Sequence, residues 1–363
     1  VAGLAYSLGS GAMSNSIPEI EDADLLFIFG YNGADSHPIV ARRIVRAKEK
    51  GATLITVDPR VTETARISDM HLPIKGGTNM ILVNAFGNVL INENLYDEEF
   101  IKEHTDNFEE YKKIVEPYTP EYAAKYTNIP ADMIRKTMRE YAKAKDAMIL
   151  YGMGVCQFSQ AVDVVKGLAS LALLTGNFGR PNVGIGPVRG QNNVQGACDM
   201  GALPDCYPGY QKVTNPEIRA KFEKAWGVKL PSKVGLKLTE VPHAVLEEHK
   251  IKAYYIFGED PVQSDPDAAE VREALDECEF VVVQDIFMNK TGLHADVIFP
   301  ATSWGEHDGV YSSADRGFQR IRKAVEPKGD VKTDWQIICE VSTAMGYPMH
   351  YNNTKEIWDE MRS

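Results

Sequence analysis

The residues best suited to chemistry lie in one glycine-rich segment, Gly184–Gly201, with the sequence GIGPVRGQNNVQGACDMG. Glycine allows a backbone to pass close to a ligand. Arg189 is the only cation in this segment, and it stands among the amide side chains of Gln191, Asn192, Asn193 and Gln195. Because a guanidinium binds a carboxylate through two parallel hydrogen bonds, the segment predicts a loop that recognises a small planar anion. A polar, solvated surface loop is the alternative interpretation.

Size and composition narrow the class of protein. The chain has 363 residues, enough for two domains or somewhat more, and 44% of them are apolar, enough to build cores. The formal net charge of −12 argues against a general nucleic-acid or anionic-membrane binder. No apolar run is long enough to cross a bilayer, and the first residues lack the pattern of a signal peptide. The sequence predicts no membrane insertion.

Five scattered cysteines form no CxxC pair: Cys156, Cys198, Cys206, Cys278 and Cys339. Neither a disulfide framework nor a metal knuckle is indicated. A reducing, cytoplasmic location fits this cysteine usage best. The chain begins with Val rather than Met, which suggests a fragment or a processed product.

Short apolar runs predict buried parallel strands that alternate with helices. In the first part of the chain the runs are Asp24–Gly30, Thr53–Asp58, Met70–Ile74 and Ala147–Gly152, with a helix over Pro38–Lys50 and several helices over 97–145. After the patternless residues 202–240, a second cycle follows with Lys252–Gly258, Phe280–Asp285 and Asp296–Pro300. We treat Met153–Gln157 and the glycine-rich segment as loops.

The two cycles have matching spacings. Gly30 and Asp58 are 28 positions apart, and Gly258 and Asp285 are 27 apart. A proline lies 15 positions beyond the aspartate in both cycles. Duplication explains this most simply, and it predicts an α/β fold of two related, doubly wound, Rossmann-like parallel-sheet domains with helices on both faces. The expected divisions are residues 1–191 and 192–303, followed by a mixed segment, residues 304–363.

Ligands of open parallel sheets bind beyond the carboxyl ends of the strands, so the loops after the predicted strands should line ligand sites. Asp58 and Asp285 are suited to hydrogen bonding with a ribose or with the donor edge of guanine. Neither cycle has a GxGxxG motif, so ordinary NAD binding is not supported. Taken singly, each aspartate is more typical of a turn or a helix cap; as a pair they favour two nucleotide-like ligands.

The other candidates carry little weight. The adjacent side chains of Glu306, His307 and Asp308 are typical of solvated hydrogen bonding rather than of one acid/base or metal centre. His37 lies in a predicted ligand-facing loop, where it could instead cap the next helix. His71 and His294 lie beside predicted strands and are expected to be structural.

Several strings together resemble one family, the catalytic subunit of molybdopterin-dependent formate dehydrogenases. They are HPIVARRIVRAKEKGATLITVDPR, GMGVCQF, GPVRGQNNVQGACDMGALPDCYPGY, GEDPVQSD, VVQDIF, FPATSWGEHDGVYSSADRGFQR and KTDWQI, and they run along essentially the whole chain. The string around Arg189 is specific to this family, whereas more distant molybdopterin oxidoreductases share only the general pattern.

The resemblance implies oxidation of formate to carbon dioxide at a molybdenum or tungsten atom held by two molybdopterin guanine dinucleotides. Arg189 matches the arginine that orients formate. By resemblance, the first dinucleotide is held by Asn32, Asp35, Ser36, Asp58, Arg60 and Gly77, and the pterins lie near Met153, Gln157 and Gln191. The second is held by Gly258, Glu259, Asp260, Gln284, Asp285 and Asp334, with Asp58 and Asp334 at the guanine ends. An electron-transfer subunit or carrier is the implied partner.

The chain also departs from the family pattern. The metal-ligating selenocysteine or cysteine, followed by His-Gly-Pro, belongs just upstream of Val1, as does a domain with a four-iron four-sulfur cluster, and a C-terminal domain belongs downstream. We therefore expect the chain to work with the remainder of the subunit and to be inactive alone. A cofactor-binding module without redox activity, and a related oxidoreductase acting on another substrate such as nitrate, remain as alternatives.

Overall fold

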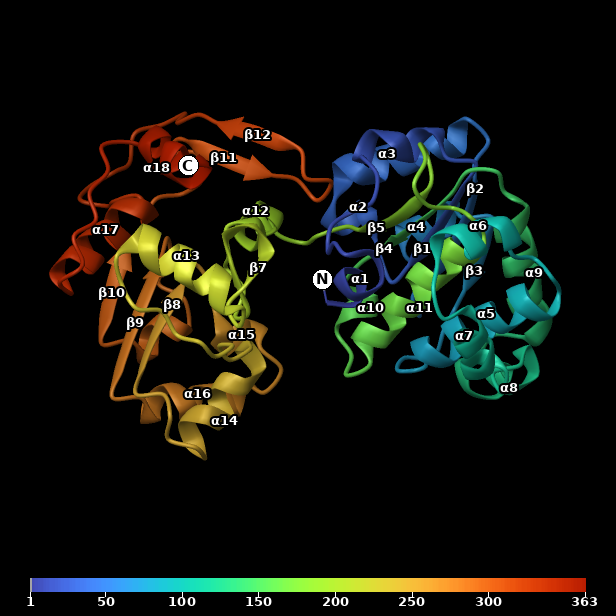
Figure 1. The fold of residues 1–363 in the computed structure, drawn as a ribbon, viewed down its shortest axis with the longest axis horizontal. Coiled ribbons are helices and arrows are strands. Elements are labelled where there is room, and N and C mark those ends of the chain that lie inside the picture. Colours follow the sequence, from blue (N-terminus) through green and yellow to red (C-terminus); the bar gives the residue numbers. More distant parts are fainter. Residues whose placement is uncertain (1) are drawn as a thin grey trace. The chain divides into compact units, whose positions relative to one another are not determined.

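The structure is a computed structural model, and it describes residues 2–363. They form two compact units (Figure 1). The first contains the residues up to Gly196 together with Ser312–Gly317, and the second contains Ala197–Tyr311 together with Phe318–Ser363. The predicted divisions at residues 191 and 303 remain predictions about domains of the whole protein.

The first unit is built on a five-stranded parallel sheet in the order β3-β2-β1-β4-β5. Its strands are β1 (Leu25–Phe29), β2 (Thr53–Val57), β3 (Met70–Leu72), β4 (Ala147–Tyr151) and β5 (Gly184–Pro187). The central strand β1 pairs with β2 on one side and with β4 on the other. The order in which successive strands are added to the sheet therefore reverses beside β1, between β1 and β4, where open α/β sheets place their ligand crevice.

Both faces of this sheet are buried, which is why β1 is an uninterrupted apolar run. Leu25, Phe27 and Phe29 belong to the larger core, and Leu26 and Ile28 belong to the core on the opposite face. The rings of Phe27 and Phe86 meet edge to face at a centroid distance of 5.6 Å. Two layers of helices follow from this burial (Figure 1).

The helices of the first unit follow the sequence signals. Pro38 opens α3 because its fixed φ suits the first helical position, and Thr119 caps α8 by accepting a bond from the amide of Tyr122. The elements are α1 (Ala2–Leu8), η1 (Ile17–Asp22), α2 (Gly33–Ser36), α3 (Pro38–Glu49), α4 (Glu63–Ile67), α5 (Asn79–Asn92), α6 (Glu98–His104), α7 (Phe108–Val115), α8 (Pro120–Thr127), α9 (Ala131–Lys143), α10 (Met153–Cys156) and α11 (Ala161–Leu174).

The second unit contains a three-stranded parallel sheet in the order β10-β9-β8, formed by β8 (Ala253–Phe257), β9 (Phe280–Asp285) and β10 (Val297–Pro300). Ile256, Val281 and Val283 pack with Val271 and Leu275 to form its core. The helices are α13 (Pro216–Trp226), η3 (Leu238–Glu240), α14 (Val241–Leu246), α15 (Pro261–Ser264), α16 (Ala268–Glu277), η4 (Thr291–His294), α17 (Asp334–Ala344) and α18 (Thr354–Arg362).

Smaller elements complete the description. They are α12 (Val194–Asp199), β6 (Cys206–Tyr207), η2 (Pro208–Tyr210), β7 (Gln211–Lys212), β11 (Gly309–Ser312) and β12 (Phe318–Ile321). The α/β class with parallel sheets and flanking helices is confirmed, with five strands in one sheet and three in the other.

Two local expectations were wrong, and one region with little sequence pattern contains a helix. The segment expected to be one glycine-rich loop contributes β5 and α12, and its glycines reflect close packing: a Cβ on Gly184 would lie 2.1 Å from Ser14 Oγ. Residues 153–157 contain the short helix α10, because β4 leads directly into a turn packed on Gly30. The residues without a visible pattern, 202–240, contain α13, which Asn215 caps.

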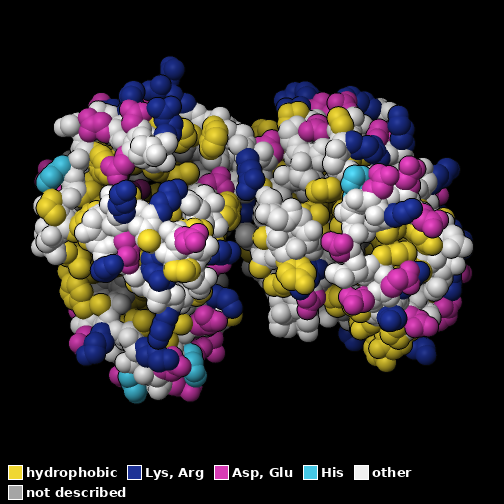
Figure 2. Space-filling view, in the orientation of Figure 1, with side chains coloured by type: hydrophobic (Ala, Val, Ile, Leu, Met, Phe, Trp, Pro, Cys, Tyr) yellow, Lys and Arg dark blue, Asp and Glu magenta, His cyan; other side chains and the backbone are white. Residues whose placement is uncertain are grey.

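Within residues 2–363, no helix is long and apolar enough to span a membrane. On the face drawn in Figure 2, acidic and basic side chains are interspersed over each unit.

Candidate functional site

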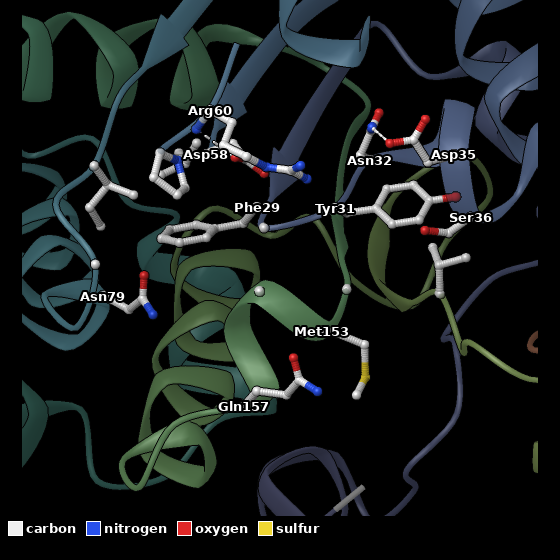
Figure 3. Close-up of a pocket in the computed structure, with 18 of the residues that line it drawn as sticks. Phe29, Tyr31, Asn32, Asp35, Ser36, Asp58, Arg60, Asn79, Met153 and Gln157 are labelled. Carbon is white, nitrogen blue, oxygen red and sulfur yellow. Dashed lines mark hydrogen bonds between the residues drawn. The ribbon is translucent and has the colours of Figure 1, made fainter. Parts of the chain in front are cut away.

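A cavity of about 430 Å³ opens at the carboxyl edge of the five-stranded sheet. It is lined by the last residues of β1 and β2, Phe29 and Val57, and by residues that follow each of the five strands. These are Gly30, Tyr31, Asn32, Asp35, Ser36 and His37 after β1, Asp58, Pro59 and Arg60 after β2, Ile74, Gly76 and Asn79 after β3, Gly152, Met153, Gly154, Gln157 and Phe158 after β4, and Val188 and Gly190 after β5. Figure 3 shows Asn32, Asp35 and Ser36 grouped together, with Met153 and Gln157 across the cavity.

Two glycines bring the first and fourth loops together. Gly30 has a φ of +57°, which L side chains rarely adopt. Its carbonyl accepts a 3.0 Å bond from the amide of Gly154, and a Cβ on Gly30 would lie 2.7 Å from the carbonyl carbon of Gly154. A side chain at either position would separate the loops, so these glycines set the width of the cavity.

Asn32 anchors the loop after β1. Its Nδ2 donates to Asp35 Oδ2 at 2.6 Å, and its Oδ1 accepts from the hydroxyl of Thr64 at 3.1 Å. Both Asn32 and Thr64 are buried. The side chain that precedes α2 is thus fixed from two sides before any ligand binds.

Asp58 forms the turn after β2. Its Oδ1 accepts a 2.8 Å bond from the amide of Arg60 (Figure 3), which is the geometry of an Asx turn. Its carbonyl is 2.9 Å from Nε2 of His71, so His71 has the structural role that was expected. With 6% of its surface exposed, Asp58 keeps a second carboxylate oxygen for a donor in the cavity.

Arg189 lies between two residues that line the cavity, Val188 and Gly190. Its guanidinium donates from Nη2 to the carbonyl of Gly11 at 3.2 Å. Burial raises the pKa of the nearby Cys156 thiol, and the positive charge of Arg189 opposes that rise. The guanidinium is therefore close enough to Cys156 to favour the charged form of its thiol.

The side chain of His37 contacts the backbone of Arg189, and the sequence does not reveal this contact. Nε2 of His37 lies 2.5 Å from the carbonyl oxygen of Arg189. His37 is the residue before α3, yet its side chain does not cap that helix. Nδ1 of His37 and the hydroxyl of Tyr31 are buried and have no hydrogen-bond partner within residues 2–363. A polar ligand or water is expected at such atoms.

In the second unit, hydrogen bonds bring together the predicted residues around β8 and β9. Asp260 Oδ1 accepts from both the amide (3.0 Å) and the hydroxyl (2.6 Å) of Thr291. Asn289 Nδ2 reaches the carbonyl of Glu259 at 3.2 Å and Asp285 Oδ2 at 3.0 Å. Burial raises the pKa of Glu259, and the negative charge of the neighbouring Asp265 adds to the rise.

Asp334 joins the same group from the start of α17. The Nε2 of buried Gln284 donates to Asp334 Oδ1 at 2.8 Å. Asp285, the next residue, forms a turn by accepting a 3.0 Å bond from the amide of Phe287. Gly258 directly follows β8, has a φ of +62° and donates from its amide to the carbonyl of Gln284 at 2.8 Å.

The two units use the same bonds at the same points of their sheets. The glycine after the first strand donates to the second strand at 2.8 Å in both units, Gly30 to Val57 and Gly258 to Gln284. The aspartate at the carboxyl end of the second strand, Asp58 just after β2 and Asp285 as the last residue of β9, accepts from the amide two positions on. A threonine six positions beyond that aspartate bonds the residue that precedes the first short helix.

Three residues predicted for this site are not among those that line the cavity: Arg189, Gly77 and Gln191. Arg189 lies between the lining residues Val188 and Gly190. Gly77 follows the lining residue Gly76 and has a φ of +84°, and Gln191 follows the lining residue Gly190 and is exposed. Sequence reasoning missed Tyr31, Asn79 and Thr64; the spacing of Thr64 and Thr291 from their aspartates was the available signal.

A second cavity, of about 840 Å³, lies among the helices of the first unit and is bordered by Asn84, His104, Tyr111 and Lys166. None of the predicted site residues lines it.

No group of three or more metal-ligating side chains occurs within residues 2–363. Glu306 bonds the amide of Ser303 and Asp308 bonds the amide of Lys323.

Comparisons with known proteins agree on one family. The family model described as "Molybdopterin oxidoreductase" matches residues 5–344. Formate dehydrogenase H of Escherichia coli (strain K12) is 60% identical over 363 residues, which are 100% of this chain and 51% of that protein. F420-dependent formate dehydrogenase subunit alpha of Methanocaldococcus jannaschii is 48% identical over 100% of this chain and 54% of its own length.

The chain thus spans about half the length of these curated relatives. Among solved structures, acetylene hydratase from Pelobacter acetylenicus matches with a TM-score of 0.77 and 23% identity, covering 95% of this chain and 50% of that one. That likeness concerns the fold alone.

Proposed function

Because this chain belongs to the molybdopterin oxidoreductase family, we propose that it is the central, cofactor-binding part of a formate dehydrogenase catalytic subunit. In that role it serves the reversible oxidation of formate to carbon dioxide at a molybdenum or tungsten atom held by two molybdopterin guanine dinucleotides. The full-length similarity to proteins named formate dehydrogenase supports this. The observation that carries it is the single cavity on which five strand-end loops converge, with Arg189 between two residues of its wall.

The matched hydrogen bonds support two dinucleotides. Gene duplication accounts for three features that the two units share at equivalent points. These are the bond from the glycine after the first strand to the second strand, the Asx turn, and the bond from the threonine to the loop after the first strand. Related units hold related ligands at equivalent edges of their sheets. We assign one dinucleotide to each unit on this basis.

The donor set of the first unit fits such a ligand. Ser36 and Arg60 offer a hydroxyl and a guanidinium to phosphate, and Asp58 offers a carboxylate to guanine. The buried, unpartnered hydroxyl of Tyr31 and Nδ1 of His37 require a polar group in the cavity. The first dinucleotide is assigned to Asn32, Asp35, Ser36, Asp58, Arg60 and Gly77, with Met153, Gln157 and Gln191 beside the pterins.

The second dinucleotide is assigned to the connected group in the second unit, which comprises Gly258, Glu259, Asp260, Gln284, Asp285 and Asp334. Asp334 takes the guanine end there, as Asp58 does in the first unit. Gln284 orients the Asp334 carboxylate through its 2.8 Å bond.

Arg189 is the proposed catalytic residue. Its guanidinium binds the formate carboxylate by two hydrogen bonds and keeps its charge there while the C–H bond breaks. When bound, the cofactor supplies the acceptor for the two electrons that formate releases. The remainder of the subunit and an electron-transfer subunit or carrier then take up these electrons.

The test measures dye reduction by the purified full-length protein with formate and with nitrate as substrates. The metal and pterin contents of the same protein are measured alongside. We expect about two pterin guanine dinucleotides per metal and reduction driven by formate. Cofactor binding without turnover would assign the chain to a binding module instead. Turnover with nitrate but not with formate would replace formate as the substrate.

A further inference from the structure

We propose that His37 is a positioning residue that holds Arg189 for the substrate anion. This inference rests on the function proposed above for Arg189. The carbonyl of Arg189 is 2.5 Å from Nε2 of His37, across 152 positions of sequence. A carbonyl oxygen only accepts, so Nε2 carries the hydrogen and donates it.

The bond fixes the point at which the Arg189 side chain leaves the backbone. β5 ends at Pro187, and the amide of Val188 still bonds the carbonyl of Tyr151 at 2.9 Å. Beyond it, Gly190 and Gln191 are exposed. The imidazole of His37 therefore holds the backbone at the position where support from the sheet ends.

His37 itself is held firmly. Its amide donates to the carbonyl of Gly33 at 2.8 Å, and its carbonyl accepts from the amide of Ala41 at 2.9 Å. Pro38 follows it and restricts its backbone. The ring of Tyr31, 3% exposed, lies beside the imidazole at a centroid distance of 5.5 Å. These contacts fix the position of the imidazole relative to the loop after β1.

The position of His37 links two functions. It directly follows Ser36, at the end of the loop assigned to the first dinucleotide, and its side chain reaches the residue assigned to formate. Nδ1 is buried and has no hydrogen-bond partner within residues 2–363, and it is an acceptor when Nε2 holds the hydrogen.

The test compares His37→Ala and His37→Gln in the full-length enzyme. Glutamine places an N–H donor near the position of Nε2, whereas alanine removes it. The matched control is His104→Gln, which changes a histidine with 57% of its side chain exposed at the end of α6. Each variant is measured for pterin content, for amide hydrogen exchange in peptides covering residues 188–193, and for kcat and KM with formate.

For His37→Ala we expect faster exchange over residues 188–193 and about a tenfold higher KM for formate, with pterin content and kcat close to the parent; tenfold corresponds to about 1.4 kcal/mol. His37→Gln should restore both values, and His104→Gln should change neither. Unchanged exchange in His37→Ala, or failure of glutamine to restore it, would overturn the proposal. Loss of pterin at an unchanged KM would make His37 a cofactor ligand instead.

The exchange measurement needs no substrate, so it tests the His37 bond even when formate proves not to be the substrate. An enzyme that does not oxidise formate refutes the proposed function, whereas an unchanged exchange pattern refutes the role of His37.

Discussion

The hydroxyl of Thr64 donates to Oδ1 of Asn32 at 3.1 Å and joins the helix after β2 to the loop after β1. Thr291 makes the corresponding bond to Asp260 at 2.6 Å in the second unit. In both units this bond holds the loop that borders the proposed ligand site. The two bonds differ in one respect, because the acceptor is a neutral amide in the first unit and a carboxylate in the second.

That difference predicts unequal costs for matched substitutions. Thr64→Val removes one bond to a neutral acceptor and should lower the free energy of unfolding by about 1 kcal/mol. Thr291→Val removes a bond to a charged acceptor and the 3.2 Å bond from the amide of Val262, and should cost about 2–3 kcal/mol. Urea unfolding of both variants measures this. Equal losses of unfolding free energy would contradict the prediction that the Thr291 bonds stabilise the second unit more than the Thr64 bond stabilises the first.

Every strand of the two sheets except β5 coincides with a predicted apolar run. In β1, burial on both faces of the parallel sheet accounts for the run Leu25–Phe29. The repeat was visible because each run is followed by a landmark residue, Asp58 or Asp285. These signals are local in the sequence, and the structure places Asp58 on the cavity wall.

The contact between His37 and Arg189 could not be predicted, because it joins residues 152 positions apart through a backbone carbonyl. No residue type at position 189 is needed to supply that acceptor, so the sequence carries no signal for it. The strand β5 was missed for a related reason: its glycines are required by the close approach of Met13 and Ser14, and this cannot be distinguished from loop flexibility in the sequence.

Glu19 predicts a pH-dependent contribution to stability. Burial tends to raise its pKa, but hydrogen bonds from Asn15, Asn182 and Ser16 outweigh this and lower the pKa to about 2 from 4.5. A lowered folded-state pKa stabilises the fold above the unfolded value, and this stability is lost as the pH falls from 4.5 towards 2.

Glu19→Gln should therefore lower the free energy of unfolding at pH 7 by about 1 kcal/mol, since Glu19 is partly exposed and screened. The gap between the variant and the parent should narrow below about pH 4.5. Urea unfolding of both proteins at pH 7, 5 and 3 measures the gap. A constant gap across this range would show that the charge of Glu19 does not contribute.

Substitution of the paired aspartates Asp58 and Asp285 distinguishes their role in the turn from their proposed role in ligand binding. Asp58→Asn retains an oxygen that accepts from the amide of Arg60, so the turn should persist while the negative charge is lost. We expect unchanged stability but a clear fall in guanine nucleotide released by acid hydrolysis of the full-length protein. Asp285→Asn should lower the nucleotide content in the same way, but it should also lower stability, because it loses the bond that Asn289 Nδ2 donates to the second carboxylate oxygen. Full nucleotide content in both variants would remove these carboxylates from the proposed sites.

The central claim is tested most directly by the kcat/KM for formate of full-length Arg189→Ala, measured at matched pterin content. Arg66→Ala, which removes an exposed arginine paired with Glu63, is the control. Loss of a charged donor at the reacting group predicts a fall of about a hundredfold or more for Arg189→Ala and none for Arg66→Ala. Formate oxidation by Arg189→Ala at the rate of the parent would contradict the account.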